Sequence, residues 1–176
     1  FFANYGLNSG TNENYGNVFR IDNNSTQDFE WDRDNTSHLL KTGVDYYIND
    51  QNTLSFFTIQ NFFDALATGS TMVTFLNGDF DNVHQINTTD LETKTQTYNL
   101  NFKHDFDKEG HNLEMEANFS ITDAPEYAAF QELNNPNDPI LNYEDDIMND
   151  RNNMTINIDY VNPLSESSKM ELGLES

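Results

Sequence analysis

Side chains able to do acid–base or metal chemistry are common in this sequence, but their spacing builds no recognisable reaction centre. Glu114 and Glu116 are two residues apart, so in a strand they share one face, as the carboxylate pair of a glycosidase does. Lys103 is expected beside them, which favours a solvated wall instead. No G-x-S-x-G motif is present. The histidines lack metal-ligand spacing; they are His38, His84, His104 and His111. We therefore expect no enzyme.

Acidic residues cluster in segments that we expect to be loops. Oxygen-rich loops suit calcium, but none of these has the spacing of an EF-hand. We expect no cofactor, with calcium as the one metal whose ligand chemistry these loops offer. The clusters are Asp28, Glu30, Asp32 and Asp34, then Asp79 and Asp81, then Glu144, Asp145, Asp146 and Asp150.

Composition excludes several classes of protein. The chain has 30 acidic and 8 basic residues, and this net charge of −22 repels phosphates, so we expect no nucleic acid partner. Its 14 Phe and 8 Tyr argue against disorder. No run of apolar residues is long enough for a membrane-spanning helix, and no cysteine is present for a disulfide.

Strict alternation of apolar and polar residues predicts β-strands. The clearest case is TYNLNFKHDF followed by HNLEMEANFSI, with the turn Asp107-Lys108-Glu109-Gly110 between them. Placing Phe106 opposite His111 fixes the register of this hairpin. The pairs that then face one another are Phe102 with Met115, Leu100 with Ala117, Tyr98 with Phe119, and Lys103 with Glu114.

The same pattern recurs along the chain and predicts seven antiparallel strands, four in one direction and three in the other. Tight turns are expected at NDQN, DKEG and PLSESSK. Long loops are expected at roughly 23–35, 77–92 and 131–149. Short turns on one side and long loops on the other are typical of a transmembrane barrel. We interpret residues 1–176 as one partial barrel domain of up-and-down strands, with both ends cut and the remaining strands outside it.

The two faces of these strands predict different surroundings. We expect the lipid-facing residues to be Tyr98, Leu100, Phe102, Leu113, Met115, Phe119, Met154, Ile156, Ile158, Tyr160 and Leu172. We expect the residues that face the lumen or a plug to be Asn99, Asn101, Lys103, Asp105, Asn112, Glu114, Glu116, Asn118, Asn157, Asp159 and Glu171. Aromatic residues beside the short turns, such as Tyr46, Tyr47, Phe106 and Tyr160, suit a membrane interface. A soluble antiparallel sheet remains the alternative fold.

Three hairpin segments resemble a known family. They are GVDYYINDQNTLSFF, TYNLNFKHDFDKEGHNLEMEANFS and IDYVNPLSESSKMELGLES. In this order they resemble the barrel of TonB-dependent outer-membrane receptors of the Bacteroidetes type, and they cover most of residues 35–176. Glu175 stands where that family often has a basic residue.

The resemblance implies a barrel of about 22 strands around an N-terminal plug domain. It implies a protein of the Gram-negative outer membrane, with extracellular loops, that imports a nutrient. Its partners would be outer-membrane lipid, its own plug, an inner-membrane energy-coupling protein reached through the plug, and a surface lipoprotein or larger complex. Two other functions stay open: a structural subunit of an export or assembly complex, and a soluble, acidic, calcium-dependent adhesion module.

Overall fold

The computed structural model describes residues 1–78, 80–135 and 138–176, and within them nine antiparallel strands form one sheet. The order across the sheet is β1-β2-β3-β4-β5-β8-β9, with β6 on β4 and β7 on β6. The strands are β1 (Phe2–Arg20), β2 (Ser25–Asn49), β3 (Asn52–Phe75), β4 (Val83–Asp105), β5 (Asn112–Asp123), β6 (Glu126–Asn135), β7 (Asp138–Ile147), β8 (Asp150–Ser165) and β9 (Ser168–Glu175). The all-β prediction is confirmed.

Two of the nine strands continue the strand before them in the same line: β6 continues β5, and β8 continues β7. β4 places Lys94 opposite Asp123 of β5 and Leu91 opposite Glu126 of β6, which is one unbroken register. The interruption falls at Pro125, which has no N–H to donate, although its carbonyl still accepts from the Glu92 N–H at 3.2 Å. The pairing of β8 with β5 and of β7 with β6 likewise keeps one register. When β5 is joined with β6 and β7 with β8, the described residues form seven continuous strands, the number that the sequence predicts.

The hairpin of β4 and β5 confirms the predicted register at every pair. Phe102 lies opposite Met115, and Tyr98 lies opposite Phe119. The Phe106 N–H donates to the His111 carbonyl at 2.9 Å, which closes the turn. Gly110 has a φ of 74°, a left-handed conformation that glycine adopts without steric cost.

The long loops predicted for residues 23–35, 77–92 and 131–149 are wrong over most of their length. Ser25–Asn35 belongs to β2, Val83–Glu92 belongs to β4, and β6 and β7 fill most of the third segment. Asp79, Pro136 and Asn137 of these predicted loops lie outside the described residues. The error has a physical cause: these stretches are rich in Asn and Asp, which favour loops, and their few apolar residues, such as Phe29 and Trp31, form only short runs of alternation, whereas the hydrogen bonds between strands depend on the backbone alone.

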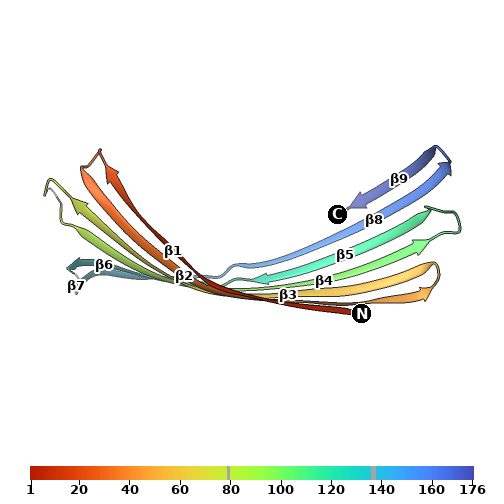
Figure 1. Ribbon diagram of the computed structural model, residues 1–176, viewed down its shortest axis with the longest axis horizontal. Helices are drawn as coiled ribbons and strands as arrows, with labels where there is room; N and C mark the ends of the chain where they lie inside the picture. The colour runs from red at the N-terminus through yellow and green to blue at the C-terminus, as the bar shows by residue number, and fades with distance from the viewer. Residues whose placement is uncertain (79, 136–137) are drawn as a thin grey trace.

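The strands are much longer than a bilayer requires. β2 has 25 residues, whereas about 9–11 residues cross the hydrocarbon core. Figure 1 shows one curved sheet with the β2–β3, β4–β5 and β8–β9 turns at one end and the other hairpins at the opposite end. Among the described strands, each contacts only its hydrogen-bonded neighbours. No helix in the described residues is long and apolar enough to cross a membrane.

Candidate functional site

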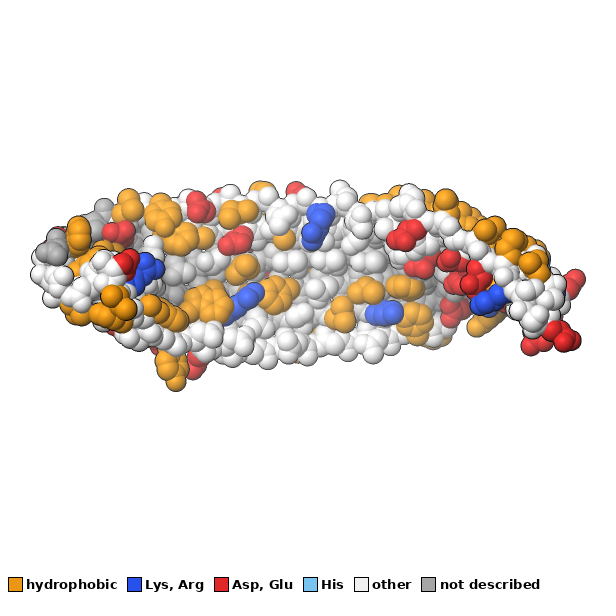
Figure 2. All heavy atoms as spheres, turned by 90° about the horizontal axis from the view of Figure 1, so that it is seen from above, with side chains coloured by type: hydrophobic (Ala, Val, Ile, Leu, Met, Phe, Trp, Pro, Cys, Tyr) orange, Lys and Arg blue, Asp and Glu red, His pale blue; other side chains and the backbone are white. Residues whose placement is uncertain are grey.

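The sheet has a concave and a convex face, which alternate residues define. We call concave the face that carries Asn99, where the buried residues Ala65, Ala67 and Ala128 also lie. Figure 2 looks onto this hollow side, where Lys and Arg side chains lie beside hydrophobic ones. The Lys41 Nζ atom is 4.8 Å from the centre of the Phe57 ring. Both residues belong to the concave face.

Strand pairing gathers each predicted set of residues on one face. The eleven residues predicted to face lipid all lie on the convex face, and the eleven predicted to face the lumen all lie on the concave face. On the convex face, Met154 and Leu172 are each 58% exposed, because no other described strand covers them. The convex face therefore presents an apolar surface with no protein partner in the described part of the chain.

This apolar surface forms a band of limited depth. On β5 it runs from Leu113 to Ile121, nine residues, and then gives way to Asp123. On β8 it runs from Tyr160 to Met154 and gives way to Asn152 and then to Asp150, which lies opposite Asp123. On β5 this depth falls within the ~9–11 residues that a tilted strand needs to cross the hydrocarbon core, whereas on β8 the apolar run is seven residues long. The boundary on β8 falls one convex position earlier than on β5, because Ile121 lies opposite Asn152 and Phe119 lies opposite Met154.

Beyond the band, the convex face becomes acidic. Pairing places twelve carboxylates there: Glu13, Asp28, Glu30, Asp32, Asp34, Asp64, Asp90, Glu92, Asp123, Glu144, Asp146 and Asp150. The predicted cluster at residues 28–34 thus lies along one side of β2. In the described residues, no group of three or more His, Asp or Glu side chains could hold a metal ion.

One ionisable group in this acidic region has a shifted pKa. A hydrogen bond to the Glu144 carboxylate raises the pKa of Tyr127 above its usual value of 10.0. Partial desolvation and the negative charges of Glu144 and Asp146 act in the same direction. The Tyr127 phenol is therefore held in its protonated form.

On the concave face, amide and carboxylate side chains form a hydrogen-bonded ladder near the short turns. Asn99 is 2% exposed, and its Nδ2 donates to Glu116 Oε1 at 2.7 Å and to Asn118 Oδ1 at 2.6 Å. Asn118 Nδ2 also donates to Glu116 Oε1, at 2.6 Å. Asn101 Nδ2 donates to Glu114 Oε1 at 2.7 Å. These contacts fix the side chains without a bound molecule.

The predicted cross-strand pair of Lys103 and Glu114 has the right register but makes no ion pair. Lys103 Nζ instead contacts Asp105 Oδ1 at 3.1 Å, two residues along the same strand and face. Three buried side-chain atoms of the concave face have no hydrogen-bond partner among the described residues, and they are Asn99 Oδ1, Asn157 Oδ1 and Arg33 Nε. Each can still accept or donate a bond to water or to another protein segment.

Histidine takes part in an aromatic cluster at the β4–β5 turn, which the sequence did not indicate. The His111 ring stacks on Phe106 with centroids 3.9 Å apart, and His111 Nε2 lies 2.9 Å from the Tyr160 hydroxyl. His104 packs edge-on against Phe106. As expected, the register does not pair His104 with His111, because His104 lies opposite Leu113. The signal available in the sequence was the concentration of rings beside one turn.

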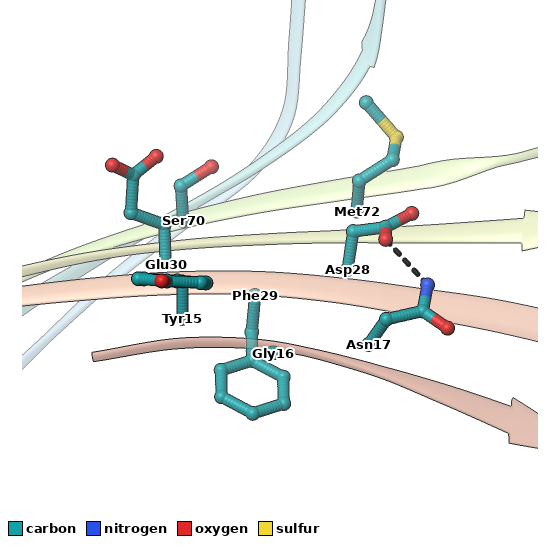
Figure 3. Close-up of a pocket in the computed structure, with 8 residues that line it drawn as sticks. All are labelled: Tyr15, Gly16, Asn17, Asp28, Phe29, Glu30, Ser70 and Met72. Atoms are coloured by element: carbon teal, nitrogen blue, oxygen red, sulfur yellow. Dashed lines mark hydrogen bonds between the residues drawn. The ribbon is translucent and has the colours of Figure 1, made fainter.

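A shallow groove of about 580 Å³ crosses β1, β2 and β3 near the β1–β2 turn (Figure 3). Glu30 and Asp28 stand on one side of it, and Asn17 Nδ2 donates to Asp28 Oδ1. The Phe29 ring lies over Gly16, so a Cβ at position 16 would clash with it. The groove is therefore a carboxylate-lined part of the acidic convex region.

Comparison with known proteins gives a family match over part of the chain. Residues 104–176 match the model of the Outer membrane protein beta-barrel family. The matched segment begins in β4 and ends beyond β9. The sequence matches no curated protein.

Comparison with solved structures identifies the fold. The ferric yersiniabactin uptake receptor FyuA from Yersinia pestis is similar with a TM-score of 0.57 and 9% identity, covering 97% of this chain and 25% of the receptor. FpvA of P. aeruginosa, solved with heterologous pyoverdines, gives a TM-score of 0.33 and 7% identity, covering 98% of this chain and 35% of FpvA. This chain thus spans about a quarter of the first receptor's length. The antiparallel sheet matches a segment of a receptor barrel, and the family match supports an outer-membrane barrel.

Proposed function

We propose that this sheet is part of the wall of a transmembrane β-barrel in the outer membrane of a Gram-negative bacterium. One observation carries the proposal: the apolar band on the convex face is nine residues deep on β5 and gives way at one end to acidic residues on the same face. A soluble sheet would bury such a face under a second layer. In a barrel, the convex face contacts lipid, and the concave ladder faces the lumen or a plug.

The open edges of the sheet support closure by further strands. β1 and β9 each pair on one side only among the described residues, and an unpaired edge in hydrocarbon is costly. The complete barrel in this proposal is a TonB-dependent transporter of the Bacteroidetes type that imports a nutrient. Its β1–β2, β3–β4 and β6–β7 hairpins are extracellular. Its plug lies against the hydrogen-bonded ladder of the concave face and contacts an energy-coupling protein of the inner membrane. A surface lipoprotein is a further partner, and the wall itself performs no catalysis.

Fractionation of cells that make the complete protein tests the membrane assignment. We expect it in the outer-membrane fraction, extracted only by detergent and migrating faster on a denaturing gel when it is not boiled. The proposal includes no cofactor, so a chelator should leave extraction and migration unchanged. Recovery in the aqueous fraction, with a chelator-sensitive fold, would instead identify a soluble calcium-dependent module.

Import is tested separately in the organism that makes the protein. Deletion of its gene should slow growth when one nutrient is limiting, and restoration of the gene should reverse the defect. Normal growth on every limiting nutrient, together with co-purification in a fixed complex, would contradict import and favour a structural subunit.

A further inference from the structure

A pocket of about 550 Å³ lies on the concave face, midway along β4, at the end of β5 and at the start of β8. The register sets Thr122 opposite both Thr95 and Arg151, and it sets Ser120 opposite Asn153. Three neighbouring strands thus present two short rows of hydroxyl, amide and guanidinium groups. The lining residues are Thr93, Thr95, Ser120, Thr122, Arg151, Asn152 and Asn153.

The pocket holds no carboxylate among the residues that line it, in a chain with 30 acidic residues. Two carboxylates are immediate chain neighbours, Asp123 beside Thr122 and Asp150 beside Arg151. Successive side chains of a strand point to opposite faces, so Asp123 and Asp150 lie opposite each other on the convex side. Alternation therefore separates the positive charge of Arg151 from the nearest negative charges in the sequence.

Arg151 is exposed and makes no ion pair in the described part of the chain, where the ion pairs are those of Lys103 with Asp105 and of Lys169 with Glu171. A guanidinium group carries five N–H donors in a planar fork that matches a carboxylate or phosphate. In so acidic a protein, a cation with free donors beside a pocket whose lining has no carboxylate is a local exception.

The hydroxyl groups around Arg151 have spare capacity to donate. The oxygens of Thr95 and Thr122 are 3.4 Å apart, and those of Thr97 and Ser120 are 3.3 Å apart, so these bonds are long. A hydroxyl can rotate to donate to a stronger acceptor, and charged acceptors give the stronger bonds. An anionic oxygen placed in the pocket would accept hydrogen bonds from the Arg151 guanidinium and from hydroxyl groups of β4 and β5.

We propose that this pocket binds the anionic oxygen group, carboxylate or phosphate, of a small solute in the barrel lumen. The inference rests on the proposed function only in placing the pocket inside a barrel, and it adds the chemistry of the solute. The net charge of −22 opposes non-specific anion binding, so any binding must come from a local site.

The test measures binding of inorganic phosphate and of citrate to the complete protein, folded in detergent micelles, by equilibrium dialysis. We expect Arg151→Gln to weaken binding of the preferred anion at least tenfold, because the guanidinium supplies charge-assisted hydrogen bonds. Arg20→Gln is the matched control: Arg20 also lies on the concave face but at the far end of β1, outside the pocket, and its loss should leave binding unchanged. The two probes separate a phosphate site from a carboxylate site.

Thr122→Asp provides a second variant, since it places a carboxylate opposite Arg151, and it should abolish binding, whereas Thr122→Asn should retain it. Gel migration without boiling checks that each variant is folded. Folded wild-type protein that binds neither anion, or that binds equally well after Arg151→Gln, would overturn the inference and leave the membrane assignment intact. Arg151-dependent binding by a protein that never enters membranes would overturn the membrane assignment and leave the pocket intact.

Discussion

Phe102 lies directly opposite Met115 on the convex face, within the apolar band of the β4–β5 hairpin. If this band contacts acyl chains, a charge at Met115 is costly: an arginine on the lipid face of a barrel costs about 2–4 kcal/mol near the bilayer midplane. We expect Met115→Arg to lower the yield of folded protein in the outer membrane, measured by migration without boiling. Asp159→Arg, at nearly the same depth on the concave face, is the control and should assemble normally. Equal assembly of the two variants would contradict the assignment of the convex face.

Glu116 is the central acceptor of the concave ladder, because Oε1 receives bonds from both Asn99 and Asn118. Glu116→Ala should reduce the free energy of unfolding by about 1–3 kcal/mol, since it removes an acceptor from the buried Asn99 amide. Urea titration of the folded complete protein measures this loss. Glu175→Ala, on the same face but exposed, should have little effect. A loss of equal size at both positions would show that the ladder adds nothing.

Position 43 on β2 requires glycine, because side chains of β1 and β3 lie very close to it. A Cβ at this position would lie 2.7 Å from Phe57 Cβ and 2.7 Å from the Phe2 ring. Phe57 Cβ is fixed to the backbone and cannot move aside, so Gly43→Ala should destabilise the fold by about 1–3 kcal/mol through overpacking.

Gly10→Ala is the matched control for Gly43, because nothing lies within 4 Å of the new methyl group. It should be neutral or slightly stabilising in the same unfolding measurement. A stable Gly43→Ala variant would mean that Phe57 and Phe2 do not approach position 43 this closely in the complete protein.

The raised pKa of Tyr127 predicts that alkaline pH weakens the β6–β7 hairpin. Because the folded-state pKa of Tyr127 is raised above 10.0, its contribution is fully present below pH 10.0 and is lost as pH rises through the raised value. Difference absorbance between wild type and Tyr127→Phe should show this tyrosine ionising later than a free tyrosine. Ionisation at or below pH 10.0 would show that the hydrogen bond to Glu144 is absent.

The sequence predicted the register of the β4–β5 hairpin because one face is apolar and the other polar over residues 97–106 and 111–121, so that a one-residue slip would invert both. It also predicted the DKEG turn, since Gly110 provides the left-handed conformation. The extensions of β2, β4, β6 and β7 could not be predicted in this way, because their apolar residues are few and do not keep one face apolar over a whole strand.

The lack of a sustained alternation is also the reason why the sequence did not predict the Arg151 pocket. Arg151 precedes the first apolar residue of the β8 pattern, Met154, and neighbours a segment that was expected to be a loop. Only the paired backbone brings Arg151 beside Thr122 and Thr95. The partners of His111 and the ion pair of Lys103 likewise depend on side-chain conformations that a register does not specify.

Contact between the convex face and acyl chains is tested most directly with single cysteines, since this sequence contains none of its own. A fluorophore attached at Ile156 or at Asn157, adjacent residues on opposite faces of β8, is measured in vesicles containing nitroxide-labelled lipids. We expect strong quenching at Ile156 and little at Asn157, with the reverse order for a water-soluble quencher. Equal quenching by lipid at both positions, or quenching only at Asn157, would contradict the membrane barrel.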